Sequence, residues 1–285
     1  MKIGLFVPLG NGSTPSLVRS IGREAEARDF ESLWVAEHVV LFDDYASQYP
    51  YAENGRFPGG GDTGLLEPLT ALAFLAAVTD RIRLGTGICL VPQRNPVYTA
   101  KQVVDVDVLS GGRVDFGVGV GWLEEEFDVL QVPFAHRGAR TDEYLDVMTS
   151  LWQDEVSEYH GEHYDMPPCR LYPKPVQLPH PPIHVGGESP AALRRVAKHG
   201  QGWYTFNRLP EDLDEPLARL DGLLATQGRS RSDIELTVCP YMHEVTPELV
   251  EAYAARGVDR LVLLCMIFEE SAVTSTLDAL AALRP

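Results

Sequence analysis

The chain has 285 residues, of which 45% are hydrophobic. This length fits either two small domains or one large α/β barrel, and the apolar content is sufficient for an extensive core. Lys and Arg number 24 against 41 Asp and Glu, which gives a net charge of −17. Such an acidic chain repels phosphate backbones and anionic lipid surfaces at long range. We therefore expect no nucleic-acid partner and no membrane partner.

The cysteines are scattered along the chain and form no CxxC pair; they are Cys89, Cys169, Cys239 and Cys265. We expect a reduced, cytoplasmic protein without a disulfide or zinc framework. The opening run MKIGLFVPLG is broken too early by Pro8 and Gly10 for a signal peptide. No stretch approaches the roughly 20 apolar residues of a membrane span.

Short β-rich runs alternate with helical runs along the whole chain. Strands are predicted at residues 2–8, 32–40, 82–92, 113–121, 183–187, 202–206, 234–241 and 260–266. Helices are predicted at residues 14–30, 67–80, 98–112, 137–153, 189–200, 210–228, 246–257 and 270–284. Eight strands, each followed by a helix, predict a (β/α)8 TIM barrel of the α/β class. A doubly wound sheet is the alternative, but the regular repetition without a shift in composition favours one barrel domain over residues 1–285.

One segment interrupts this alternation. Residues 154–182, between the fourth helix and the fifth strand, are rich in Pro, Tyr and His and show no helical period. We expect this insertion to form a long excursion, with a small hairpin, beside the active face and over its pocket.

In a TIM barrel the chemistry lies at the C-terminal ends of the strands. Glu37 and His38 end the second strand, where a histidine can exchange protons near neutral pH or can simply be bonded into the barrel rim. Gly85 and Gly87 lie inside the third strand. Glycine there marks either a close approach of the backbone to a ligand or a bend at a barrel corner.

The stretch IHVGGESP ends the fifth strand and begins a helix. Free backbone N–H groups and the helix dipole make such a helix start suitable for a phosphate, and a plain capped helix is the alternative. Ser189 can serve as the N-cap or as a phosphate ligand. Glu188 is unexpected because it places a negative charge beside the proposed anion.

Other patterns carry weaker signals. GVGVGW, residues 117–122, fails the Gly-x-Gly-x-x-Gly dinucleotide fingerprint. The HxxH pair His160 and His163 lacks a third ligand pattern, so we expect no metal. The acidic run at residues 124–128 is interpreted as a solvated helix start. The aromatic group at residues 203–206 is interpreted as core, with a pocket wall as the alternative.

Three stretches together resemble the bacterial luciferase-like monooxygenase superfamily, whose barrels use FMN or the deazaflavin F420. They are WVAEHVV, LGTGICLVPQRNPVYTAKQVVDVDVLSGGRVDFGVGVGW and PPIHVGGESPAALRRVAKHGQGW, in that order. Within the superfamily, the chain is similar to an actinobacterial branch of F420-dependent oxidoreductases. The resemblance implies hydride transfer between F420 and a small organic substrate. An FMN-dependent monooxygenase and a non-catalytic flavin-binding barrel are the alternatives.

The resemblance also implies roles for individual residues. His38 matches the histidine near the reactive face of F420, with Glu37 beside it, and these two are the implied catalytic residues. Gly87-Ile88 matches a bulge with a non-prolyl cis peptide behind the cofactor ring. The implied cofactor-binding residues are His38, Thr86, Gly87, Ile88, Val120, Gly121, Trp122, Gly186, Gly187, Glu188 and Ser189.

One position departs from a related pattern. The F420-dependent sugar-phosphate dehydrogenases carry a catalytic glutamate just after the fourth strand, where this chain has Trp122. A sugar phosphate is therefore disfavoured, and a flatter, more apolar substrate is expected. Homodimers are common in the family, so we expect a homodimer. An ordinary phosphometabolite barrel is disfavoured because the glycine-rich loop follows strand five, not strands seven and eight.

Overall fold

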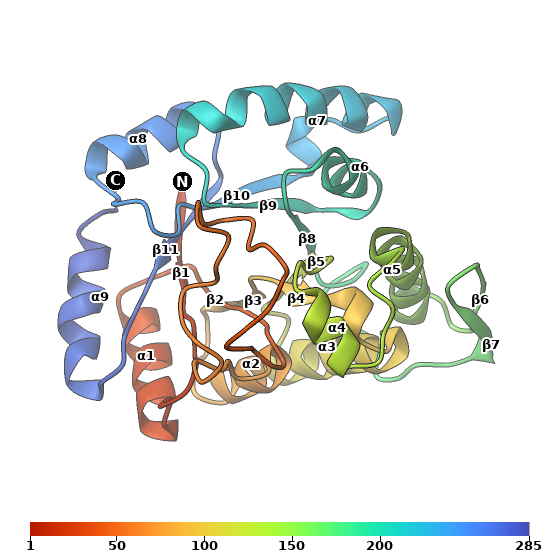
Figure 1. The fold of residues 1–285 in the computed structure, drawn as a ribbon, viewed down its shortest axis with the longest axis horizontal. Coiled ribbons are helices and arrows are strands. Elements are labelled where there is room, and N and C mark those ends of the chain that lie inside the picture. The colour runs from red at the N-terminus through yellow and green to blue at the C-terminus, as the bar shows by residue number, and fades with distance from the viewer. Residues whose placement is uncertain (285) are drawn as a thin grey trace.

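The computed structural model describes residues 1–284 and shows a closed parallel barrel surrounded by helices (Figure 1). Its strands run in the order β3-β2-β1-β11-β10-β9-β8-β5-β4, and β3 also pairs with β5, which closes the ring. The short strands β3 and β4 are two segments of one barrel strand. The strands are β1 (Lys2–Phe6), β2 (Ser32–Val35), β3 (Arg83–Thr86), β4 (Cys89–Leu90), β5 (Val114–Gly119), β8 (Ile183–Gly186), β9 (Gly202–Phe206), β10 (Glu235–Cys239) and β11 (Arg260–Leu264). The predicted TIM barrel is confirmed.

Helices cover the outside of the barrel. They are α1 (Pro15–Ala27), α2 (Pro68–Ala76), α3 (Pro96–Ser110), α5 (Arg137–Gln153), α6 (Pro190–His199), α7 (Asp214–Thr226), α8 (Pro247–Ala255) and α9 (Val273–Ala281). Five of these begin with proline directly after a capping residue whose side chain accepts a backbone N–H. Proline suits this position because its fixed φ is helical and its missing N–H would have no partner there. The sequence therefore marks the helix starts strongly.

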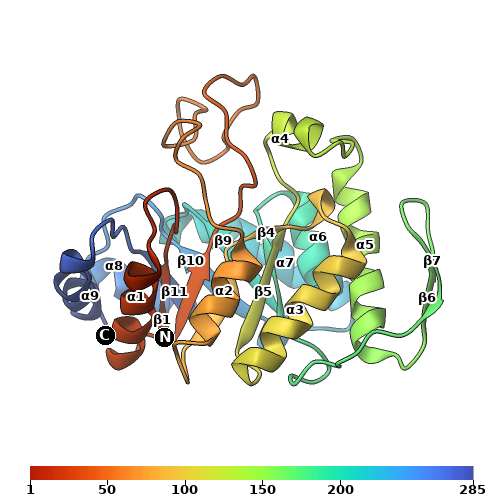
Figure 2. The ribbon, with the colours of Figure 1, turned by 90° about the horizontal axis from the view of Figure 1, so that it is seen from below.

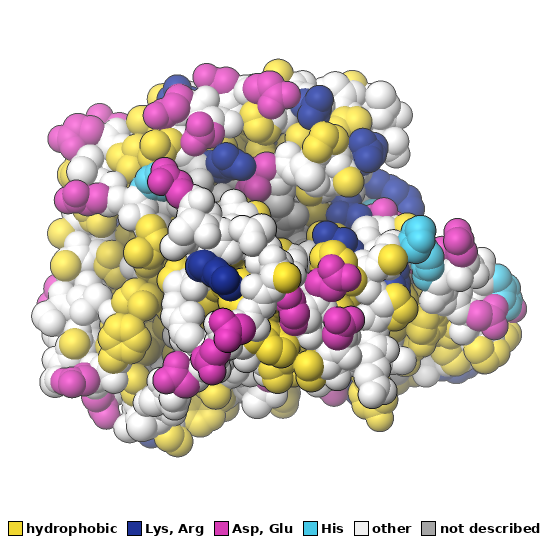
Figure 3. All heavy atoms as spheres, in the orientation of Figure 1, with side chains coloured by type: hydrophobic (Ala, Val, Ile, Leu, Met, Phe, Trp, Pro, Cys, Tyr) yellow, Lys and Arg dark blue, Asp and Glu magenta, His cyan; other side chains and the backbone are white. Residues whose placement is uncertain are grey.

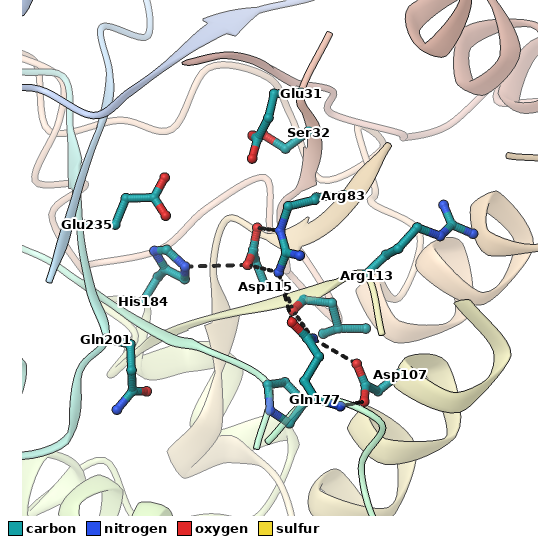
Figure 4. Close-up of polar contacts among 12 residues, drawn as sticks. Glu31, Ser32, Arg83, Asp107, Arg113, Asp115, Gln177, His184, Gln201 and Glu235 are labelled. Carbon is teal, nitrogen blue, oxygen red and sulfur yellow. Dashed lines mark hydrogen bonds and ion pairs between the residues drawn. The ribbon is translucent and has the colours of Figure 1, made fainter. Parts of the chain in front are cut away.

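The N-terminal end of the barrel is filled by buried charges (Figure 4). Arg83 Nε donates to Asp115 Oδ2 over 2.9 Å, and an Arg260 guanidinium nitrogen lies 3.4 Å from the same oxygen. Burial raises the pKa of Asp115, but the nearby His184 ring, the hydrogen bonds from Arg83 and the charge of Arg260 outweigh it and hold that pKa far below its usual value. These side chains plug one end, so any ligand cavity must open at the other.

The insertion prediction is partly wrong. Residues 154–182 do contain an antiparallel hairpin, β6 (Ser157–His160) with β7 (Asp165–Cys169). However, the hairpin lies outside α5, away from the barrel mouth (Figure 2), and no residue of the segment lines the cavity described below. The physical reason is that the segment connects a helix to a strand, and such connections lie at the N-terminal end of the strands.

A different segment covers the mouth. Residues 36–67, between β2 and α2, rise above the C-terminal strand ends together with the short helix α4 (Glu124–Val129) (Figure 2). We call residues 36–67 the covering loop. Its far end is tied to the β1–α1 loop, because Asn11 N donates to Thr63 O over 2.9 Å and Leu66 N donates to Leu9 O over 2.8 Å. Within residues 1–284, no helix combines the length and apolar character needed to cross a bilayer.

Candidate active site

A cavity of about 1060 Å³ opens at the C-terminal ends of the barrel strands. Ligand pockets commonly hold about 300–1,000 Å³, so this one has room for a flavin-sized cofactor together with a small substrate. Residues after all the barrel strands contribute to its wall, and the covering loop adds several aromatic side chains. Of the predicted site residues, those lining the cavity are Glu37, His38, Gly87, Ile88, Val120, Gly121, Trp122, Gly186, Gly187, Glu188 and Ser189.

The cavity floor is the Gly87-Ile88 bulge between β3 and β4. Its peptide bond is cis, which confirms the prediction for these two residues. A Cβ at Gly119 would lie 2.0 Å from Ile88 Cδ1, and one at Gly186 would lie 2.8 Å from the same atom. These glycines therefore provide the space in which the Ile88 side chain packs.

The glycine alternation in GVGVGW has the same cause. A Cβ at Gly117 would lie only 1.9 Å from Thr86 O, so the backbones of β3 and β5 can approach this closely only at glycine. Thr86 itself does not line the cavity, and its hydroxyl donates to Gly117 O over 2.6 Å. Thr86 thus stabilises the pairing of β3 with β5 beneath the cavity floor, and its side chain does not contact the cavity.

Below the bulge lies Tyr204. A Cβ at Gly87 would be 3.1 Å from the Tyr204 hydroxyl, and that hydroxyl is buried without a hydrogen-bond partner in the described residues. Trp203 points away from the cavity and donates to Gly187 O. The core interpretation therefore holds for Trp203, while Tyr204 and Phe206 line the cavity.

His38 is held by a carboxylate that sequence reasoning placed in solvent. Glu126, in α4, is 0% exposed, and its Oε2 lies 3.0 Å from His38 Nδ1. Gln93 Nε2 donates to the same oxygen over 3.0 Å, and the backbone N–H of Val39 donates to the other over 2.6 Å. The interpretation of residues 124–128 as a solvated helix start is therefore wrong for Glu126. The helical spacing of Leu123, Glu126 and Phe127, all buried, was the available signal.

The ionisation of Glu126 follows from these partners. Burial raises its pKa, but the hydrogen bond and charge of His38, with further hydrogen bonds from Gln93 and the Val40 backbone, outweigh it and hold the pKa below its usual value. An ionised carboxylate only accepts, so the His38 Nδ1–H donates to it. This bond fixes the ring orientation and leaves Nε2 facing the cavity, with no hydrogen-bond partner among residues 1–284.

Glu37 lines the cavity, but its carboxylate is already engaged. Arg94 Nε donates to Glu37 Oε1 over 2.7 Å, and the Leu90 backbone N–H donates to Oε2. Arg94 also donates to Glu67 Oε1 over 2.6 Å, at the N-cap of α2. Glu37 therefore joins the end of β2 to β4 and α2, and so fixes the bulge beneath the cavity.

The glycine-rich loop after β8 presents backbone donors to the cavity. Ser189 caps α6 by accepting from Ala192 N over 3.1 Å, and Gly187 has a φ of +98° that favours glycine. The backbone N–H groups of Glu188, Ser189 and Ala191 have no acceptor within residues 1–284. The Glu188 carboxylate points the other way, accepting from the Thr205 hydroxyl over 2.9 Å. Its charge therefore does not oppose an anion at the loop.

Two arginines that the sequence analysis did not name also line the cavity. Arg137 and Arg208 line it, and within the described residues neither forms an ion pair with a carboxylate. Burial lowers the pKa of Arg137, and the charge of Arg140 lowers it further, against the opposing influence of Glu124. Lys and Arg side chains gather beside α6 on this face of the molecule (Figure 3). A bound anion would supply the missing counter-charge.

Trp122 connects His38 to the covering loop. Its ring centroid lies 5.8 Å from that of His38 and 5.2 Å from that of Tyr49, both in edge-to-face geometry. The backbone turns at Gly121, whose φ is +77° and where a Cβ would lie 2.9 Å from Phe127 Cε2. Residues 120–122 thus form a wall of the cavity beside His38, as the resemblance implied for their position.

Among residues 1–284, no three His, Cys, Asp or Glu side chains are arranged to hold a metal ion. His160 is exposed in the hairpin and contacts Asp165 and Glu158, while His184 lies in the plugged end of the barrel. Of the histidines considered for metal, none lines the cavity.

The fold and this cavity define a (β/α)8 barrel with a ligand site at the C-terminal ends of its strands, and comparison with known proteins shows its family. Residues 1–271 match the family model described as luciferase-like monooxygenase, so the chain belongs to that family. It is 34% identical over 241 residues to the uncharacterized protein Rv0940c of Mycobacterium tuberculosis, covering 85% of this chain and 79% of the relative. An FMNH(2)-dependent dimethylsulfone monooxygenase of Pseudomonas putida is 33% identical over 156 residues, covering 53% of this chain and 42% of that protein.

A solved structure shares the fold along the whole length. It is an F420-dependent secondary alcohol dehydrogenase in complex with an F420-acetone adduct, with a TM-score of 0.78, 18% identity, and coverage of 100% of this chain and 99% of that one. Proteins similar to this chain thus include both F420-dependent and FMN-dependent enzymes.

Proposed function

We propose that this protein is an F420-dependent oxidoreductase that transfers a hydride between the deazaflavin and an organic substrate. One observation carries the proposal. The Gly87-Ile88 floor, His38 and the donor loop at Gly187–Ser189 line a single cavity, which provides a support for a ring, a proton-exchanging group and an anion site in one space.

The residues present fit such a cofactor. The free N–H groups at the start of α6, with Arg137 and Arg208 beside them, would hold a phosphate. The bulge would support the tricyclic ring, and residues 120–122 would flank it. When bound, F420 supplies the two-electron step, because its C5 gives or takes a hydride.

The position of the donor loop supports F420 over FMN. Ser189 and Ala191 are exposed, so a phosphate bound there would lie at the protein surface. FMN ends at its phosphate, whereas the phosphate of F420 continues into an acidic tail. A surface position flanked by unpaired arginines accommodates such a tail and complements its charge.

His38 is the residue suited to move the accompanying proton. Its Nδ1–H is committed to Glu126, so Nε2 is the nitrogen that can give a proton to, or take one from, a substrate oxygen in the cavity. Glu126 and Glu37 are positioning residues, since the first orients the His38 ring and the second holds the bulge. The covering loop restricts the access of water to this space.

An FMN-dependent monooxygenase is the second candidate. It is favoured by the partial similarity to the FMNH(2)-dependent enzyme of Pseudomonas putida. That reaction uses oxygen, so the two candidates differ in an easily measured co-substrate.

The deciding experiment is a set of titrations of the purified protein with F420, with FMN and with 8-hydroxy-5-deazariboflavin, which has the F420 ring but no phosphate. Fluorescence quenching reports binding of each. We expect F420 to bind most tightly and the phosphate-free deazaflavin at least about tenfold more weakly. Tighter binding of FMN, together with oxygen uptake in the presence of reduced FMN, would support the monooxygenase and overturn the proposal.

A further inference from the structure

The order of strands around the barrel divides the mouth into two arcs. The residues that we propose to contact the cofactor follow β2, β3/β4, β5 and β8, and these strands are consecutive in the closed ring. The remaining strands, β9, β10, β11 and β1, are also consecutive, so their ends form one continuous wall opposite the proposed cofactor site. We call this wall the apolar arc; its apolar cavity-lining side chains are Phe6, Pro8, Phe206, Tyr241, Met242, Leu264, Met266, Ile267 and Phe268. Asn11, Ser13 and Arg208 are polar residues that line the cavity after the same strands.

Aromatic rings form the centre of the apolar arc. The ring centroids of Phe206 and Tyr241 are 4.5 Å apart, and Phe6 lies 5.8 Å from Phe206 in edge-to-face geometry. Tyr51 of the covering loop lies over Phe206 with centroids 4.9 Å apart. Tyr241 has a φ of +57°, an unfavourable conformation for an aromatic residue that the surrounding structure must enforce. The backbone is thus held so that this ring lines the cavity.

Apart from Arg208, which follows β9 next to β8, the apolar arc carries no charged side chain that lines the cavity. The ionisable Asp, Glu and Arg side chains lining the cavity are Glu37, Asp62, Arg137, Glu188, Arg195 and Arg208. Glu37, Glu188 and Arg195 are each hydrogen-bonded within the protein, and Arg137 Nε donates to Gly121 O. Arg208 follows β9 at the border with the cofactor side, and Asp62 belongs to the covering loop. A charged group placed against β1, β10 or β11 would lose its hydration without compensation, which is costly.

Hydroxyl groups are the polar atoms available near this wall. Burial raises the pKa of Tyr49, with a further increase from its neighbour Tyr241, and burial likewise raises the pKa of Tyr241. Both hydroxyls therefore stay protonated and can donate a hydrogen bond to an uncharged carbonyl or hydroxyl oxygen.

The outer edge of the apolar arc is exposed. Met242 is 66%, Met266 48% and Phe268 72% exposed, although all three line the cavity. Large apolar side chains gathered at the rim of a pocket indicate a surface that a ligand covers. Figure 3 shows hydrophobic side chains on the same face, away from the basic group beside α6.

We propose that the substrate is an uncharged, mainly apolar molecule with one carbonyl or hydroxyl oxygen, bound between the apolar arc and the cofactor. This inference rests on the proposed function and adds the substrate class to it. The apolar body packs on Phe206 and Tyr241, the oxygen faces the tyrosine hydroxyls and His38 Nε2, and the far end covers Phe268 at the rim.

The test measures binding of matched ketones by calorimetry, with and without F420. The neutral probes are cyclohexanone and 4-phenylbutan-2-one, and their partners, 4-oxocyclohexane-1-carboxylate and 4-(3-oxobutyl)benzoate, carry the same ketone plus a carboxylate. We expect a neutral ketone to bind the F420-loaded protein at least tenfold more tightly than its carboxylate partner. Equal or tighter binding of the carboxylates, or no binding of either neutral ketone, would overturn the proposal.

Two exposed positions provide matched variants. Phe268→Asp places a charge on the rim of the apolar arc and should weaken 4-phenylbutan-2-one binding at least fivefold, whereas Leu178→Asp, at a residue 87% exposed outside the cavity, should leave it unchanged. If the two variants weaken ketone binding equally, Phe268 and the rim around it do not contact the bound ketone. F420 quenching is read separately, so selective ketone binding without F420 binding would retain the substrate class and reject the cofactor. F420 binding without ketone selectivity would retain the cofactor and reject the proposed substrate class.

Discussion

The contact between Glu126 and His38 can be tested without knowing the substrate. In the variant Glu126→Gln, the amide oxygen can still accept from the backbone N–H of Val39, but its NH2 group would face His38 Nδ1–H and the Gln93 amide, which now donate to Oε2 over 3.0 Å each. Hydrogen bonds to a charged group are worth about 1.5–3 kcal/mol each. Losing two of these bonds, with partial rearrangement, should lower the free energy of unfolding by about 3 kcal/mol. At about 2.1 cal/mol/K of unfolding entropy per residue, a chain of 285 residues should then lose about 5 °C in Tm.

The stability difference between wild type and Glu126→Gln should depend on pH in a defined direction. The folded-state pKa of Glu126 is below its usual value, so its contribution to stability is fully present above the unfolded pKa of about 4.3 and is lost as the pH falls through the folded-state pKa. The Tm difference between wild type and Glu126→Gln should therefore be largest at pH 6–7, should begin to shrink below about pH 4.3, and should be lost as the pH falls through the folded-state pKa of Glu126. Long-range ¹H–¹⁵N NMR of the imidazole should show a proton on His38 Nδ1 in the wild type and a change of the His38 nitrogen shifts in the variant.

Glu125→Gln is the matched control. The Glu125 carboxylate accepts from Ala46 N over 2.6 Å and Ser47 N over 3.2 Å and does not contact His38. This variant should leave the His38 nitrogen shifts unchanged. The reasoning is refuted if the Tm deficit of Glu126→Gln does not shrink as the pH is lowered well below the unfolded pKa of about 4.3, or if both variants alter the His38 signals equally.

Three further substitutions test the cofactor site. Arg137→Ala should weaken F420 binding about tenfold and leave binding of the phosphate-free deazaflavin unchanged, as measured by fluorescence quenching. If both ligands lose affinity equally, Arg137 does not contact the phosphate. Gly119→Ala should lower the free energy of unfolding by about 1–3 kcal/mol and weaken F420 binding, because the new Cβ would displace the Ile88 side chain. Its control is Gly222→Ala in α7, where a Cβ meets open space; this variant should raise the free energy of unfolding by about 0.5–1 kcal/mol. Denaturant titration measures both stability changes. Tyr204→Phe removes a buried hydroxyl that has no partner, so stability should not fall by more than about 0.5 kcal/mol, and a larger loss in urea titration would show that the hydroxyl is satisfied.

The fold was predictable because local signals agree with the global arrangement. The helices that begin with proline after a capping residue, such as Thr14 before α1 and Ser189 before α6, are marked by chemistry that acts within one turn. The glycines at 117 and 119 are explained by close approach between β5 and the strand beside it, which a repeat of parallel strands already implies. The site residues beside these signals were implied by the resemblance to the luciferase-like family and not by the local signals themselves.

Glu126 was missed because its burial depends on residues far away in the sequence. An EEEF run is typical of a solvated helix start, and only the covering loop, which brings Val39 and Val40 over α4, makes the last of the three glutamates a buried acceptor. The insertion was misplaced for a related reason. Its composition indicates an irregular segment, but only its position after a helix, and not after a strand, decides on which end of the barrel it lies.

The covering loop also indicates where a substrate enters. Its first half is held by α4, because Glu126 and Glu125 accept backbone N–H groups at residues 39–40 and 46–47, and its middle is held by Asn207 Nδ2, which donates to Tyr51 O over 3.0 Å. These bonds fix the loop over the side of the mouth where β2, β5 and β9 end. The ends of β10 and β11 have no such bonds to it, and there Met242 and Phe268 are exposed. We therefore expect a substrate to enter over these two side chains, because this route breaks none of the loop's hydrogen bonds.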